Sequence, residues 1–293
     1  MTKLLPLLTA ILYLFLVHFT MGLRPEHLLL TGFILLAYTL HPKTRRWTLD
    51  FLPFALFAAL YDFLRIIPKG WAGPIHVAWP YRLESVLFGF DVDGVRTIPN
   101  EFFRLHHHPL LDLVCGLAYS LHMVVPIGFG IFAWVHEKDR GIARSFAWTF
   151  LLANLFAFAT YIALPVAPPW YVEQYGLAPA DWSTPASAAG LLNFDRLLGI
   201  NYFRDMYAKS SWVFGAIPSM HAGLPLLVIL FARKILKKGM ILLALFMAAV
   251  WFSAVYLRHH YLIDLVAGAL YAIAAFLAAA LLEKKFLRGT DVR

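Results

Sequence analysis

Two side chains near the C-terminal end of the sequence have the spacing of a catalytic pair. His260 and Asp264 are four residues apart, which on a helix places both on one face, roughly 5–6 Å apart at Cβ. A carboxylate at that distance can hold one imidazole nitrogen and leave the other free as a nucleophile or base. A buried ion pair that only stabilises a helix end is the alternative interpretation.

A second histidine follows residues that are typical of a helix start. Pro218 and Ser219 precede His221, so free backbone N–H groups and the positive end of a helix dipole should lie beside it. Such a helix end suits a phosphate group, although ordinary capping would use the same residues. Taken together, His221, His260 and Asp264 could supply the nucleophile, its orienting carboxylate and the acid that phosphoryl transfer through a covalent intermediate needs.

The elements that carry these residues are predicted to be membrane helices. Of the 293 residues, 61% are hydrophobic and 14% charged, whereas soluble domains have roughly 45–50% and about 25%. We expect an all-α, polytopic membrane helix bundle of about eight transmembrane helices with a six-helix catalytic core. The predicted spans are 4–22, 27–41, 48–68, 110–135, 142–165, 218–233, 239–257 and 261–283. Residues 1–47 would form a two-helix membrane anchor, and residues 48–293 the catalytic membrane domain.

The distribution of basic residues predicts the orientation of these spans. Lys and Arg collect in short segments beside Lys3, at 43–46, at 138–144, at 233–238 and after 283, which the positive-inside rule places in the cytoplasm. The segments 165–170, 215–223 and 258–264 then meet on the non-cytoplasmic face. The net charge of +8 is thereby explained without a nucleic-acid partner. We expect an integral multi-pass protein of a bacterial or archaeal plasma membrane.

The histidine segments resemble a known family. Pro218-Ser219-Met220-His221 and His260-x-x-x-Asp264 are similar to the second and third signature motifs of the type 2 phosphatidic acid phosphatase superfamily. Classical members have Gly at the place of Met220, Arg at the place of Ala254, and basic residues in the first motif, which 165–170 lacks. With the Ala-Pro-Pro-Trp and His-His-Tyr strings, these departures resemble the inositol phosphorylceramide synthase-like branch, whose members transfer a phospho-head group between lipids.

The resemblance implies a role for each catalytic candidate. The histidine of the third motif, His260, would be the nucleophile, Asp264 would orient it, and His221 would be the general acid and base. The family's usual phosphate-binding bases are missing, so other groups must balance the charge.

Four residues are candidates for substrate or phosphate binding: Ser219, Arg65, Arg258 and Tyr161. Arg65 could instead pair with Asp62 three residues earlier, and Arg258 could be an interfacial anchor. Tyr161 could form a helix-to-helix hydrogen bond. Lys209 and Arg204 are weaker candidates in the loop that precedes the second motif.

Three functions are compatible with this pattern. A lipid phosphotransferase would move a phospho-head group, such as phosphoinositol, from a glycerophospholipid to a lipid hydroxyl through a phospho-histidine, with membrane lipids as donor and acceptor. A phosphatase would use water as acceptor and act on phosphatidate or isoprenoid phosphates. A transporter or scaffold would use the histidines only for proton relay or packing. We expect no cofactor and no metal, since the three consecutive histidines 106–108 do not have the spacing of helical ligands.

Overall fold

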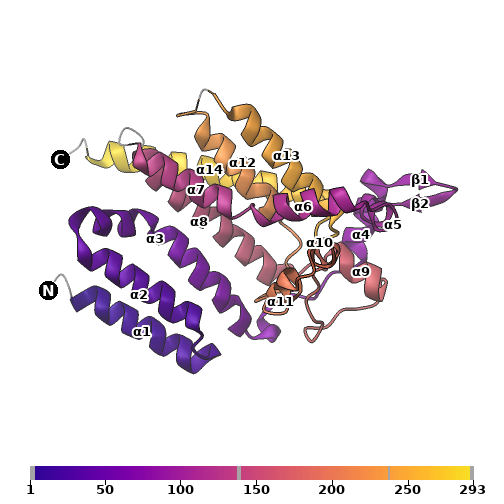
Figure 1. Ribbon diagram of the computed structural model, residues 1–293, viewed down its shortest axis with the longest axis horizontal. Helices are drawn as coiled ribbons and strands as arrows, with labels where there is room; N and C mark the ends of the chain where they lie inside the picture. The colour runs from indigo at the N-terminus through magenta and orange to yellow at the C-terminus, as the bar shows by residue number, and fades with distance from the viewer. Residues whose placement is uncertain (1–3, 137–139, 237, 291–293) are drawn as a thin grey trace. The chain divides into compact units, whose positions relative to one another are not determined.

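The computed structural model describes residues 4–136, 140–236 and 238–290, and these are mostly helical (Figure 1). Their contacts divide the chain into two compact units, one ending at Ile67 and one beginning at Pro68. Four basic residues that entered the topology prediction lie outside the described residues: Lys3, Lys138, Lys237 and Arg293.

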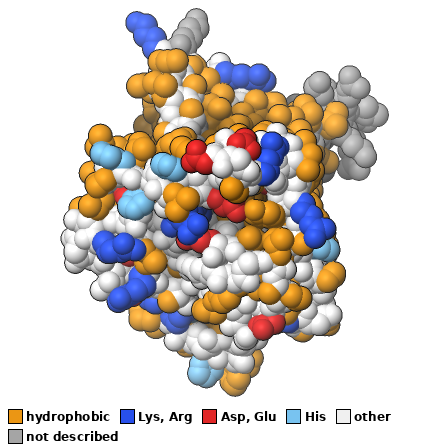
Figure 2. All heavy atoms as spheres, turned by 90° about the vertical axis from the view of Figure 1, so that its right-hand side faces the viewer, with side chains coloured by type: hydrophobic (Ala, Val, Ile, Leu, Met, Phe, Trp, Pro, Cys, Tyr) orange, Lys and Arg blue, Asp and Glu red, His pale blue; other side chains and the backbone are white. Residues whose placement is uncertain are grey.

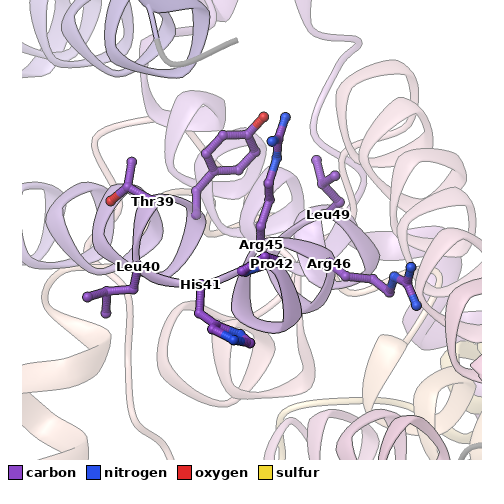
Figure 3. Close-up of a pocket in the computed structure, with 8 residues that line it drawn as sticks. Thr39, Leu40, His41, Pro42, Arg45, Arg46 and Leu49 are labelled. Atoms are coloured by element: carbon purple, nitrogen blue, oxygen red, sulfur yellow. The ribbon is translucent and has the colours of Figure 1, made fainter.

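The N-terminal unit consists of three helices, of which the first two are strongly apolar. It contains α1 (Leu4–Met21), α2 (Pro25–Leu40) and α3 (Pro42–Phe63), followed by the short 3-10 turn η1 (Leu64–Ile66). Pro25 and Pro42 begin their helices, a position where the missing N–H costs nothing. A cavity of about 360 Å³ lies at the turn between α2 and α3, where Arg45 stands over the Tyr38 ring (Figure 3). Its basic side chains belong to the 43–46 cluster that the topology prediction uses.

The second unit contains the longer helices that surround the catalytic candidates. These are α6 (Pro109–Ser120), α7 (Val124–Val135), α8 (Arg140–Ala163), α12 (Met220–Ala232), α13 (Met240–Tyr256) and α14 (Leu262–Thr290). Helix α12 packs against α14, α13, α8 and α7, so it lies in the middle of the bundle. Shorter elements connect them: η2 (Lys69–Trp71), α4 (Ala78–Phe88), α5 (Pro99–Leu105), α9 (Pro169–Tyr175), α10 (Leu191–Leu198) and α11 (Tyr202–Tyr207).

Several of the described helices are long and apolar enough to cross a membrane. In the described ranges α1, α8 and α14 up to Glu283 meet this criterion, and α6 with α7 makes a fourth if the bent pair is one span. Helices α2, α12 and α13 are apolar but shorter. The mostly helical class with several apolar helices is therefore confirmed, while the count of eight membrane spans stays a prediction.

The span predicted over 110–135 is not a single straight helix. Helices α6 and α7 are separated by a turn at 121–123 and bend by 46°. Pro126 accounts for the break, because a proline ring inside a helix clashes with the carbonyl four residues earlier, here that of His122. The bend places the C-terminal end of α6 beside the catalytic candidates.

The all-α prediction also missed a small hairpin. Strands β1 (Phe90–Val92) and β2 (Val95–Thr97) pair antiparallel, with Val92 opposite Val95. Asp93 and Gly94 between them both have positive φ, 51° and 80°, as a two-residue type I′ turn requires. The Asp-Gly pair is the signal in the sequence that predicts this turn.

Candidate active site

The structure brings His221, His260 and Asp264 together. Nδ1 of His221 lies 3.1 Å from Nε2 of His260. On its other side, Nδ1 of His260 lies 3.0 Å from the carbonyl oxygen of Ala216 and 3.4 Å from Oδ2 of Asp264. Since the Ala216 carbonyl oxygen can only accept, the ring hydrogen of His260 belongs on Nδ1. Its Nε2 therefore has a lone pair that faces His221.

The turn that holds His260 is tied down on both sides. Asn100 on α5 donates through Nδ2 to the carbonyls of Val255 and His260, at 3.0 and 2.9 Å. The N–H of Tyr261 donates to Oδ2 of Asp264 at 2.8 Å. Asp264 thus caps the start of its own helix and faces the His260 ring with the same oxygen.

The segment before α12 is held by the proline-rich segment that ends α8. Val166 forms parallel bridges with His76 and with Gly215, and its N–H donates to the carbonyl of Phe214 at 2.9 Å. The hydroxyl of Tyr161 donates to the carbonyl of Pro218 at 2.8 Å. Tyr161 therefore makes the tertiary hydrogen bond that was the alternative to a substrate-binding role.

Helices α12 and α14 cross at two glycines, and this crossing sets the separation of the histidines. A Cβ on Gly268 would lie 1.9 Å from the carbonyl oxygen of Ser219, and one on Gly223 would lie 2.8 Å from the carbonyl oxygen of Gly268. The N–H of Ser219 donates to the carbonyl of Asp264 at 2.9 Å. Any side chain at 268 would force the two catalytic helix starts apart.

Burial gives the site two properties that suit phosphate chemistry. It lowers the pKa of His260, in the turn between α13 and α14, to about 4, with the Ala216 carbonyl opposing this shift. The imidazole is therefore neutral at neutral pH, and its lone pair is available. The Ser219 hydroxyl is fully buried, and no atom of the described chain hydrogen-bonds to it. A buried hydroxyl of this kind needs a partner, and a phosphate oxygen would provide one.

The aromatic rings that pack beside His221 were not among the site residues predicted from the sequence. Tyr119, at the end of α6, stacks on His221 with ring centroids 4.1 Å apart and an interplanar angle of 14°. The His122 ring is 3.9 Å from that of His221, and His259 stacks on Tyr119 and Tyr207. A π face next to His221 favours its cationic form. No local pattern in the sequence points to Tyr119, because the bend between α6 and α7 places it there.

Each arginine candidate has an acidic partner in the structure. Arg65, in the N-terminal unit, lies 3.2 Å from Oδ1 of Asp62, and Nε of Arg258 lies 2.7 Å from Oε2 of Glu173. Arg258 also lines a cavity of about 190 Å³ with eight other residues: Tyr81, Ile98, Asn100, Glu101, Arg104, Pro169, Val172 and Glu173. Figure 2 views the end of the molecule that carries β1, β2 and α5 in Figure 1, and acidic and basic side chains lie side by side near its middle.

The histidines at 106–108 serve local structure. His107 lies 3.1 Å from Asp112, His108 accepts the N–H of Leu110 at the start of α6, and His106 stacks on Phe102. Within the described ranges, no group of three metal-ligating side chains could hold an ion.

Comparison with known proteins assigns this arrangement to a family. The model of the PAP2 superfamily matches residues 95–278. The phosphoinositol dihydroceramide synthase of Bacteroides thetaiotaomicron is 39% identical over 91% of this chain and 87% of its own length. The inositol phosphorylceramide synthase of Candida albicans is 31% identical over 83% of this chain and 51% of its own length.

A third relative is the catalytic subunit of inositol phosphorylceramide synthase of Saccharomyces cerevisiae. It is 32% identical over 80% of this chain and 57% of its own length. The chain thus spans about half the length of these fungal relatives. No solved structure matches.

Proposed function

The chain belongs to the PAP2 superfamily, and on this basis we propose that it is a membrane lipid phosphotransferase that moves phosphoinositol from a glycerophospholipid to the hydroxyl of a ceramide-type lipid. One observation carries the proposal: Nδ1 of His260 lies 3.0 Å from the Ala216 carbonyl oxygen, and its Nε2 lies 3.1 Å from Nδ1 of His221. The carbonyl assigns the ring hydrogen to Nδ1, which leaves the Nε2 lone pair facing His221. The relatives are dihydroceramide and ceramide phosphoinositol synthases by name, which favours a lipid acceptor over water.

The reaction proceeds in two steps at these rings. Nε2 of His260 attacks phosphorus, the bond from phosphorus to the glycerolipid oxygen breaks, and His221 gives that oxygen a proton. His221 then removes the proton from the acceptor hydroxyl, whose oxygen attacks phosphorus as the bond to Nε2 breaks. Asp264 and the Ala216 carbonyl hold the Nδ1 hydrogen throughout, and the Tyr119 face stabilises His221 when it is protonated.

We propose that three groups balance the charge on the phosphoryl oxygens. The Ser219 hydroxyl and the N-terminal end of α12 supply donors, and at least one arginine supplies a cation. Arg258 is two residues before the nucleophile, and Arg65 closes the third predicted span. Arg258 would exchange its carboxylate partner, Glu173, for phosphate when the donor binds.

Removing the arginine that binds the phosphoryl oxygens should lower kcat/KM by roughly 10²–10³, the scale seen when a preorganised donor is lost. We expect this of Arg258→Ala or Arg65→Ala, with only partial recovery in the lysine variant, because an ammonium cannot bind two phosphate oxygens as a guanidinium fork does. Steady-state kinetics with a labelled donor lipid measures it, and Arg96→Ala is the matched control because Arg96 binds the Ser85 carbonyl. Unchanged rates in both alanine variants would refute the arginine assignment.

We further propose that the catalytic face is non-cytoplasmic, with residues 1–47 as an anchor and 48–293 as the catalytic domain. A membrane-impermeant maleimide should then label a cysteine at Ala208, in the segment before the second motif, and spare one at Lys238. Both positions are exposed, and the native Cys115 is buried, so it gives no background. Labelling of Lys238→Cys alone in intact cells would reverse the topology.

The function itself is tested with purified protein in lipid. Phosphatidylinositol labelled in the inositol ring is incubated with ceramide, with dihydroceramide and without acceptor, and the products are resolved by mass. A labelled sphingolipid that forms only with acceptor supports the transferase. Release of inositol phosphate at the same rate with and without acceptor would show a phosphatase instead.

A further inference from the structure

A buried carboxylate outside the histidine motifs holds the catalytic turn. Glu84, on the short helix α4, is 0% exposed. Its Oε1 accepts the N–H of Leu262 at 2.9 Å, and its Oε2 accepts the N–H of Ile263 at 3.1 Å. These are the first two residues of α14, whose N–H groups have no partner within the helix. A carboxylate 178 residues earlier in the chain therefore supplies a cap that is usually local.

The same turn carries the catalytic pair. The N–H of Tyr261 is taken by Asp264, and the next two N–H groups are taken by Glu84. The four consecutive residues His260 to Ile263 are thus all hydrogen-bonded. Asp264 and Glu84 bind the three N–H groups, and Asn100 binds the His260 carbonyl. A displacement of this turn would move the His260 ring and the Asp264 carboxylate together.

We infer that Glu84 is a positioning residue for phosphotransfer: by binding the first two N–H groups of α14, it sets the place of Asp264 and, through it, the direction of the His260 ring. The inference rests on the proposed function. Glu84 does not touch the reacting atoms, so its loss should lower kcat and leave the KM for the donor lipid nearly unchanged.

Proton uptake by Glu84 allows a second measurement, the pH dependence of activity. A purely structural role of Glu84 would not affect that dependence. Burial raises the pKa of Glu84 to about 7, the charge of Asp264 adds to this, and the two N–H groups oppose it. The ionisable groups that face it are Asp264 on α14 and Tyr261 in the turn, with Tyr81 and Glu101 beyond Tyr261. Protonation turns one accepting oxygen into a hydroxyl, so the turn loses a hydrogen bond as the pH falls through about 7.

Protonation of Glu84 should change the stability of the fold and the activity in opposite directions with pH. Because the pKa of folded Glu84 lies above the ordinary value of 4.5, this group makes the fold less stable as the pH rises from 4.5 toward 7. Activity should rise over the upper part of the same interval. The pKa of His260, about 4, lies too low to produce that rise.

The test compares the wild-type chain with Glu84→Gln, Glu84→Asp and Glu101→Gln, each full length and in lipid, between pH 5.5 and 8.5. Glu101 is the matched control, because its carboxylate also caps a helix, accepting the N–H of Ile98 at 3.1 Å, and it binds the Tyr81 hydroxyl. We expect Glu84→Gln to lose roughly 10–100-fold in kcat at pH 8, the scale of a small misplacement of catalytic groups. It should also lose the acid limb near pH 7, while Glu101→Gln keeps both.

A wild-type kcat and an unchanged acid limb in folded Glu84→Gln would overturn the inference. If Glu84→Gln does not fold, Glu84→Asp decides: a lowered kcat at unchanged KM supports positioning, and a wild-type kcat contradicts it. A wild-type protein that makes no product at any pH would refute the proposed function instead.

Discussion

His260→Ala should lower the rate of phosphotransfer by roughly 10⁴-fold or more and abolish any phosphorylated protein, because it removes the only atom assigned to attack phosphorus. His221→Ala should have a comparable effect with phosphatidylinositol, since His221 is the group assigned to protonate the departing alkoxide. The two variants should differ when the donor has a nitrophenolate in place of the glycerolipid alkoxide. That group leaves without a proton, so His221→Ala should still release it and His260→Ala should not.

Rapid-quench kinetics with a donor labelled at phosphorus measures both the release of the leaving group and the labelled protein. His106→Ala is the control, because His106 is exposed and its ring contacts Phe102, four residues earlier. A phosphorylated protein that still forms in His260→Ala would exclude the covalent assignment. Equal recovery of both variants with the nitrophenyl donor would show that the two histidines do not have the separate roles proposed for them.

Asp264→Asn should lower kcat/KM by roughly 10²–10³, less than the roughly 10⁴-fold loss seen for the corresponding change in a serine protease triad. An amide oxygen in the place of Oδ2 still accepts the N–H of Tyr261 at 2.8 Å. The Ala216 carbonyl, 3.0 Å from Nδ1, still holds the His260 tautomer. The variant therefore removes the negative charge that stabilises the phosphorylated, cationic ring while keeping the geometry.

The control for this prediction is Asp112→Asn. Asp112, on α6, is also buried and accepts the hydroxyl of Tyr256 at 2.8 Å. Steady-state kinetics and thermal unfolding of both variants separate charge from folding. A loss in Asp264→Asn as large as that in His260→Ala would mean that the Ala216 carbonyl cannot orient the ring alone.

Several helices, one helix start and one hairpin turn of this protein can be predicted from local sequence. The apolar runs predict membrane helices because a span must satisfy its backbone within itself. The four-residue interval from His260 to Asp264 predicts one helix face, since a single helical turn relates the two positions. Pro218 and Ser219 predict the start of α12, and the Asp-Gly pair at 93–94 was a usable hairpin signal. In each case the determining interactions lie within a few residues of one another.

The contacts between distant segments of the chain are determined by the tertiary structure, and no local sequence pattern predicts them. The separation of His221 and His260 depends on the crossing of α12 and α14, which Gly268 permits because a Cβ there would meet the Ser219 carbonyl. The Ala216 carbonyl and Glu84 reach the catalytic turn only through packing across distant segments. The bend at 121–123 brings Tyr119 onto His221. Such contacts depend on how helices pack around one another, so residues that meet in space have no fixed interval in the chain.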